Sequence, residues 1–200
     1  MPAVVGERMM HVLLIKHRAT TTQLAEALDV PTERIFAALR DAEALGYIQD
    51  SGKPRLGWAI TEDGVRYAQR RVDQTSADGK AVISTRYEVF RELNGELKKL
   101  CTDWQTRDPA TNGAAEFSDR LGPIDDRIQR ILAEIRPLAD HFADYGARFA
   151  RARTKFESGV EGYLTGVLVD SYHNIWFECH ECFLITLGRS RSNEESGSPQ

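Results

Sequence analysis

The 200-residue sequence has no apolar run long enough to cross a membrane. A membrane helix needs roughly 18 apolar residues in succession, whereas the run Val12–Ile15 is bounded by His11 and Lys16. The first ten residues carry Glu7 and lack the basic flank and apolar core of a secretory signal. Only three cysteines are present, an odd number typical of a reducing compartment. We therefore expect a cytoplasmic protein without a membrane segment.

Motifs that carry enzyme chemistry are also missing. The chain has no glycine-rich phosphate loop and no Gly-x-Ser-x-Gly turn, and His180–Glu181 lacks the second histidine of a zinc hydrolase motif. Cys179 and Cys182 lie three residues apart, but no second pair of this kind completes a four-ligand metal site. We expect no enzyme activity, no cofactor and no metal centre.

Positive charge is not in excess either. The sequence has 26 lysines and arginines against 30 acidic residues, a formal net charge of −4. Residues 1–75 contain as many basic as acidic side chains, so the excess of acids lies in the remainder. This balance argues against a protein that coats nucleic acid without selectivity.

A polar segment with glycine and serine divides the chain into two parts. The segment Asp73–Lys80 (DQTSADGK) separates a turn-rich first part from a second part with long helical patterns, so we expect domains at 1–75 and 81–188. A loop is expected at 107–115, which contains a proline and an Asn-Gly pair. Residues 189–200 contain no apolar side chain and are expected to form a disordered tail.

The first part predicts a series of short elements. Thr20 and Gln23 form the Thr-x-x-Gln pattern of a capping box, Gly46 is a typical helix terminus, and Thr61 is a typical helix cap. The predicted elements are helices at 4–17, from 20 to about 28, at 31–45 and after 61, with strand-like runs at 47–48 and 58–60 flanking a polar loop at 49–57.

Three segments carry a family resemblance: QLAEALDV at 23–30, LRDAEALGYI at 39–48 and WAITEDG at 58–64. In register, they make residues 10–72 resemble the DNA-binding module of bacterial winged-helix regulators of the MarR and PadR kind. The resemblance implies a winged helix-turn-helix fold, a sequence-specific transcriptional regulator and double-stranded DNA as the partner. It implies a homodimer as well, because one small module reads few base pairs.

The residue pattern independently fits DNA binding. Polar side chains of the third predicted helix face away from its apolar stripe, as reading the major groove requires, and Arg34 and Arg40 are the expected main donors. Threonines at a helix start suit a phosphate, and cations on the polar loop suit the DNA backbone or a narrow minor groove. The residues expected to contact DNA are Thr20, Thr21, Thr22, Thr32, Glu33, Arg34, Ala37, Arg40, Lys53 and Arg55.

A protein partner is the alternative. Phosphates repel Glu33 unless it accepts a hydrogen bond from a cytosine, and Phe36 lies where many such regulators carry a polar residue. The sequence therefore leaves open a winged-helix interaction module that does not bind DNA.

The second part predicts a mainly helical domain, which gives a mainly α fold with a small β-wing overall. Apolar residues continue at helical spacing from Ile124 to Phe156, with a break expected near Arg136 because Pro137 interrupts the pattern. Further helices are expected at about 84–106 and 171–187. Such helices bury their apolar faces either against a second copy, which we favour, or within one monomeric bundle.

The helix at 171–187 gathers residues that could bind a small-molecule effector. The candidates are His173, Trp176, His180 and Glu181. Asp170 and His173 are three residues apart and could share a hydrogen bond. The alternative is that these histidines only satisfy neighbouring carboxylates inside the fold.

Overall fold

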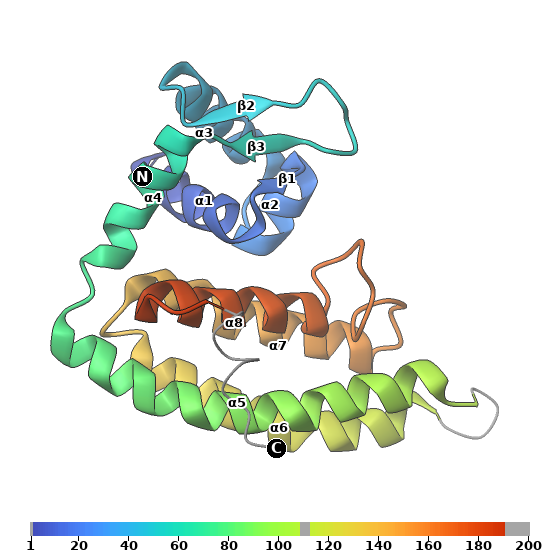
Figure 1. The fold of residues 1–200 in the computed structure, drawn as a ribbon. Coiled ribbons are helices and arrows are strands. Elements are labelled where there is room, and N and C mark those ends of the chain that lie inside the picture. The colour runs from blue at the N-terminus through green and yellow to red at the C-terminus, as the bar shows by residue number, and fades with distance from the viewer. Residues whose placement is uncertain (1, 109–112, 191–200) are drawn as a thin grey trace. The chain divides into compact units, whose positions relative to one another are not determined.

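The computed structural model describes residues 2–108 and 113–190, which form helices and one small antiparallel sheet of three strands (Figure 1). This part of the expected fold class, mainly α with little β, is confirmed. The chain divides into two compact units, here called unit 1 (Met1–Gln74) and unit 2 (Thr75–Gln200). None of the helices in the described ranges combines the length and apolar character that crossing a membrane requires.

Unit 1 combines four helices with the sheet. Its elements in chain order are α1 (Pro2–Lys16), β1 (Arg18–Ala19), α2 (Thr21–Leu28), α3 (Thr32–Ala44), β2 (Ile48–Asp50), β3 (Trp58–Ile60) and α4 (Glu62–Asp73). The strand order is β1-β3-β2, with Ala19 opposite Trp58 and Ile48 opposite Ile60. The sequence predicts only the two strands around the polar loop. It misses β1 because two residues are too few to show an alternating pattern.

The predicted helix boundaries in unit 1 are confirmed where caps define them. Thr20 caps α2 by accepting a hydrogen bond from the Gln23 amide at 3.2 Å, and the Gln23 side chain accepts from the Thr20 amide at 2.9 Å. Thr61 caps α4 through the Gly64 amide at 3.1 Å. Gly46, with φ of +74°, follows the end of α3. These local hydrogen bonds explain why short-range sequence patterns predict the starts of α2 and α4.

Close packing of α4 against the turn before β2 depends on a residue without a side chain. A Cβ atom on Gly64 would lie 2.0 Å from the Tyr47 carbonyl oxygen, so only glycine fits at this position. The core beneath is formed by apolar residues of the first three helices. Its fully buried members include Met9, Leu13, Leu24, Leu28, Ile35 and Leu39.

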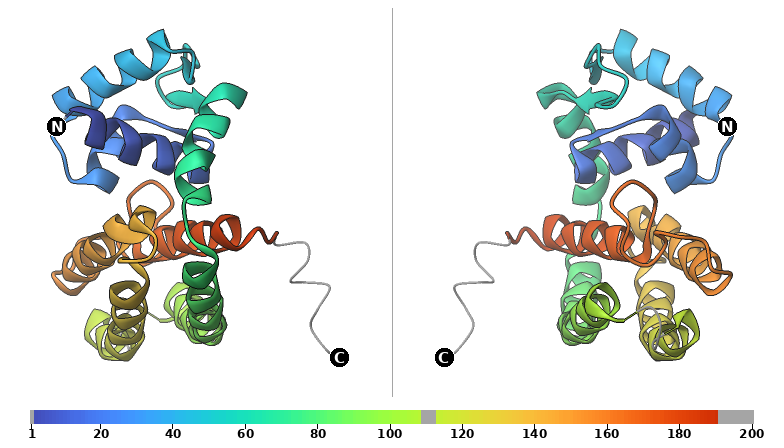
Figure 2. Two further views of the ribbon diagram at one scale, coloured as in Figure 1. Left: turned by 90° about the vertical axis from the view of Figure 1, so that its left-hand side faces the viewer. Right: turned by 90° about the vertical axis from the view of Figure 1, so that its right-hand side faces the viewer.

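The described residues of unit 2, 75–108 and 113–190, form a bundle of four long helices. They are α5 (Ala77–Thr106), α6 (Ala114–Ile135), α7 (Ala143–Glu157) and α8 (Tyr172–Leu187), with a 3-10 turn, η1 (Asp140–Phe142), before α7. Figure 2 shows them in two layers, α5 beside α6 and α7 beside α8. Contacts of α5 with α8 and of α6 with α7 join the layers.

Two predicted helices of unit 2 begin earlier than the sequence indicates. The helix expected from about residue 84 begins at Ala77, because Ser76 caps it by accepting from the Gly79 amide at 3.1 Å. The helix expected from Ile124 begins at Ala114 and contains Pro123, so glycine and proline do not end these helices. The break predicted near Arg136 is confirmed, since α6 ends at Ile135.

The long apolar pattern from Ile124 to Phe156 lies inside the bundle. Its residues are buried, apart from Leu138, which is 39% exposed. Aromatic rings of other helices cover it. For example, Phe149 packs against Trp176 with ring centroids 5.8 Å apart. The pattern is therefore satisfied within one chain and gives no reason of its own for a second copy.

The last described residues are held to the bundle. The expected tail begins at Arg189, yet the guanidinium of this residue bonds Ser84 at 2.9 Å and Glu88 at 3.3 Å, both on α5. Residues 191–200 of the expected tail, and 109–112 of the expected loop, lie outside the described residues.

Candidate nucleic-acid interface

Helix α3 has one buried and one exposed face, as predicted. The buried stripe is Ile35, Ala38, Leu39 and Ala42. The five residues of α3 expected to contact DNA, Thr32, Glu33, Arg34, Ala37 and Arg40, are all exposed.

The two arginines of α3 point in different directions. At 100° per residue, Arg40 lies about 150° from the centre of the buried stripe, whereas Arg34 lies about 90° from it, on the flank that also carries Asp41. A shallow surface hollow on the outward face of α3 agrees with these different directions, because its lining includes Arg40 but not Arg34. The hollow is lined by Thr32, Glu33, Phe36, Ala37 and Arg40. Of the two predicted donors, Arg40 is therefore the better placed on the outward face.

The polar loop between β2 and β3 is ordered by its own hydrogen bonds. The Ser51 amide donates to the Gly57 carbonyl at 3.1 Å, and the Gly57 amide donates to the Lys53 carbonyl at 3.1 Å. A Cβ on Gly57 would lie 2.3 Å from the Ala19 carbonyl oxygen, so the loop closes tightly against β1. Lys53 and Arg55 are exposed on this loop.

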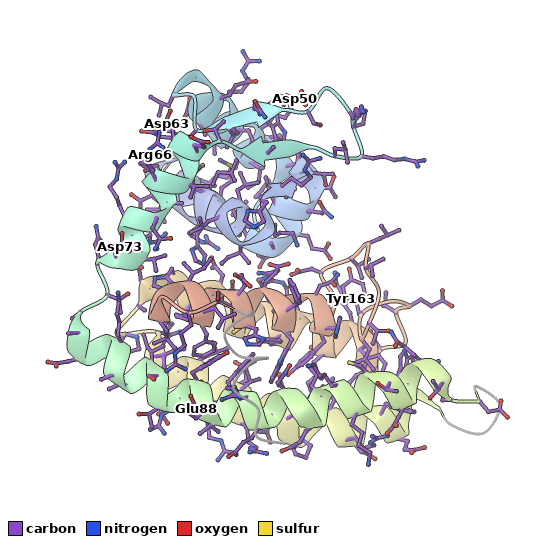
Figure 3. All side chains as sticks on the ribbon, in the orientation of Figure 1. Asp50, Asp63, Arg66, Asp73, Glu88 and Tyr163 are labelled. Carbon is purple, nitrogen blue, oxygen red and sulfur yellow. The ribbon has the colours of Figure 1, made fainter. Side chains whose placement is uncertain are left out.

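The cations of α3 and of this loop are not neutralised. Within residues 2–108 and 113–190, Arg34, Arg40, Lys53 and Arg55 take part in no ion pair. By contrast, Arg66 on the outer side of α4 bonds Asp63 at 2.5 Å (Figure 3). Cations without an acidic partner suit an anionic ligand, because binding breaks no existing ion pair.

The threonines at the start of α2 have separate roles. Thr20 is the cap, and the Thr21 hydroxyl accepts from the Trp58 indole nitrogen at 3.3 Å, so both contribute to the fold. Thr22 is exposed. The first amides of any helix have no partner within it, so the start of α2 still suits a phosphate.

The effector candidates on α8 are largely involved in packing. Trp176 is 3% exposed, stacks on Phe90 with centroids 4.6 Å apart and donates to the Asn94 side chain at 3.0 Å. The His180 Nε2 atom lies 2.7 Å from the Tyr87 hydroxyl. Glu181 is half-buried and His173 is exposed. These positions favour the alternative interpretation, in which the cluster supports the fold.

Sequence reasoning misses a buried charge cluster in unit 2. Arg148, whose side chain is 2% exposed, donates to Asp170 at 2.5 and 3.0 Å and to Glu178 at 2.7 Å. Asp170 therefore pairs with α7, not with His173 as considered from the sequence. The two acids next to Arg148 keep its pKa well above the ordinary value despite burial. An arginine in an apolar helical pattern could have signalled this cluster, because a buried charge needs partners.

The three cysteines are buried thiols. Burial raises the pKa of Cys101 to about 11 and that of Cys179 well above its ordinary value. Among the residues that the structure describes, no three histidine, cysteine or acidic side chains are grouped to hold a metal ion.

Comparison with protein-family models, with curated proteins and with solved structures finds no match.

Proposed function

We propose that the chain is a sequence-specific DNA-binding transcriptional regulator, with unit 1 acting as a winged helix-turn-helix. The observation that carries this proposal is the set of cations on α3 and on the β2–β3 loop, which have no acidic partner among the described residues. The helices of unit 1 and its β2–β3 hairpin follow the order of elements that the winged-helix resemblance implies, which supports the proposal. The exposed cations Arg34 and Arg40 on α3, and Lys53 and Arg55 on the loop, are side chains of the kind that phosphate binding uses.

In this proposal α3 enters the major groove and the loop contacts the adjacent backbone. Arg40 is the donor that reaches base edges, because it lies on the outward face of α3. Exposed Phe36 and Ala37 suit apolar contact with thymine methyl groups. Lys53 and Arg55 neutralise phosphates, and Thr22 lies at a helix start that suits another.

We propose further that the protein acts as a homodimer on two half-sites. A single module of this size reads few base pairs, so pairing supplies the missing selectivity. The Ile124–Phe156 pattern cannot provide the contact, because it is buried within the chain. Light scattering tests this proposal: a mass of twice 22.5 kDa supports it, and 22.5 kDa at micromolar concentration contradicts it.

DNA binding is tested by selecting ligands from a pool of random-sequence duplexes. The dissociation constant of the selected duplex is then measured between about 50 and 200 mM salt, where release of counterions should weaken binding steeply. A folded protein that enriches no sequence and binds no duplex at low salt contradicts the proposal.

A second candidate function is docking of a protein partner through α3. Phe36 is 50% exposed on the outward face, next to the acidic Glu33, which suits a protein surface better than phosphate. The variants Phe36→Ala and Arg40→Ala distinguish the two functions. Protein docking predicts the larger loss of partner binding for the first, and DNA reading predicts the larger loss of DNA affinity for the second.

A further inference from the structure

A surface cavity of about 310 Å³, partly open to solvent, is formed in unit 1 by residues of α1, α3 and α4 and of the turn that follows α3. This volume falls in the range of small-molecule sites. On α3 it adjoins the flank that carries Asp41, not the outward face proposed to read DNA. Its lining is Gly6, Glu7, Met10, Ala38, Asp41, Ala42, Leu45, Tyr47 and Tyr67.

One wall of the cavity is aromatic. The rings of Tyr47 and Tyr67 stack with centroids 4.6 Å apart and planes inclined by 21°. The guanidinium of Arg70 lies over the Tyr67 ring at 5.3 Å from its centroid, so this pair already attracts one cation of the chain. Ring faces attract cations through their negative electrostatic potential.

Two carboxylates border the same cavity. Glu7 on α1 and Asp41 on α3 are lining residues, and within the described part of the chain neither side chain has a hydrogen bond or ion pair. The remaining wall is apolar, formed by Met10, by two alanines of α3 and by Leu45 at the end of that helix. A Cβ built on Gly6 meets no atom within 4 Å, so the α1 wall borders open space.

We propose that this cavity binds a small organic cation with an apolar body, such as an aromatic ammonium compound. The carboxylates supply charge complementarity, the tyrosines supply cation–π attraction, and the apolar wall receives the body of the ligand. An anionic ligand is disfavoured because the charged residues of the lining, Glu7 and Asp41, are both negative, and Arg70, which lies over the Tyr67 ring, is not among the lining residues. The site lies within unit 1 and does not depend on DNA binding, so the two proposals can fail separately.

Amide NMR spectra of the full chain test the site, with benzyltrimethylammonium as the probe. We expect saturable shifts centred on Gly6, Asp41 and Tyr47. Benzyl alcohol, which is neutral, should bind more weakly, and benzenesulfonate, an anion, should leave these amides unchanged. Equal binding of cation and anion, or shifts of the cation that do not saturate, would overturn the proposal.

Variants locate the ligand in the cavity. Gly6→Leu places a side chain in the open space and should abolish binding, whereas Gly6→Ala should retain it. Because both residues favour a helix more than glycine does, neither variant should lower the melting temperature. The double variant Glu7→Gln, Asp41→Asn should weaken binding by about fivefold or more, from the loss of two charges near the cation. Undiminished binding by folded Gly6→Leu or by the double variant contradicts the proposed site.

Discussion

The two units differ in how far their cationic side chains are paired with acids. In unit 2 most arginines that the structure describes face an acid, including Arg86 with Glu134, Arg120 with Asp103, Arg127 with Glu96, Arg148 with Asp170 and Glu178, and Arg153 with Asp125 and Glu157. In unit 1 the cations of α3 and of the β2–β3 loop face none. Many arginines of unit 2 therefore join its helices through ion pairs, whereas the cations of α3 and of the β2–β3 loop in unit 1 have no such partner.

This contrast explains why total charge is a poor guide to function here. Residues 1–75 are neutral overall, but their acids do not pair with the exposed cations of α3 and the loop. The acidic excess lies in unit 2, where much of it is paired with arginine. The distribution of charge, more than its sum, carries the functional signal.

The largest expected effect comes from removing a cation that unit 2 uses internally. Arg148→Met should lower the free energy of unfolding by about 3–5 kcal/mol, because it leaves Asp170 and Glu178 buried without their counter-charge. Chemical denaturation monitored by circular dichroism measures this change.

Arg91→Met provides the matched control for Arg148→Met. Arg91 pairs with Glu88 at the surface, where the side chains are 46% and 55% exposed, so its loss should cost less than about 1 kcal/mol. Equal stability losses for the two variants would show that the buried cluster has no special role in unit 2.

The second prediction removes a cation that unit 1 leaves free. Arg40→Ala should weaken binding to the selected duplex by about 1–3 kcal/mol without lowering stability, because Arg40 is exposed and makes no ion pair within the described ranges. Fluorescence anisotropy measures the affinity.

Arg34→Ala and Arg66→Ala calibrate this effect. The sequence gives Arg34 and Arg40 equal weight, but the flank position of Arg34 predicts a smaller loss. Arg66 is paired on α4, so its removal changes the charge equally but should leave affinity nearly unchanged. An Arg66→Ala loss as large as that of Arg40→Ala would mean that only overall charge matters.

Local signals account for most of what the sequence predicts correctly. The caps at Thr20 and Thr61 and the break before Pro137 each depend on residues a few positions apart. Features that depend on distant partners are missed. Strand β1 exists because Ala19 pairs with Trp58, and the Arg148 cluster forms because α7 and α8 pack together.

In the candidate interface, too, the sequence predicts local features and misses contacts between residues far apart in the chain. Helical periodicity predicts which residues of α3 are exposed, yet it does not predict that Thr21 bonds Trp58 or that Trp176 lies in the bundle core. The cavity lined by Tyr47 and Tyr67 was not predicted, because three helices far apart in the sequence form it.

The third prediction concerns the two cations of the β2–β3 loop. The double variant Lys53→Ala, Arg55→Ala should reduce the slope of log affinity against log salt by about 2, because two phosphate contacts are lost. Affinity should fall similarly for selected and random duplexes, since phosphate contacts carry no sequence information. An unchanged slope would remove the loop from the proposed interface.

The smallest expected effect arises where unit 2 places two basic groups near each other. Partial loss of hydration around the His173 ring, which remains partly exposed, and the charge of Lys98 lower the pKa of His173 below its ordinary value of 6.5. As pH falls through 6.5, the unfolded chain therefore takes up a proton more readily than the folded protein, and stability decreases until the lower folded pKa is passed.

Between pH 7.5 and 5, the His173→Gln variant should lose less stability than the unmodified protein does. Lys98→Met should raise the His173 pKa. Unfolding measured across this pH range, with an NMR titration of His173, checks both statements. Parallel stability profiles and an unshifted titration would show that this pair of basic groups does not affect folding.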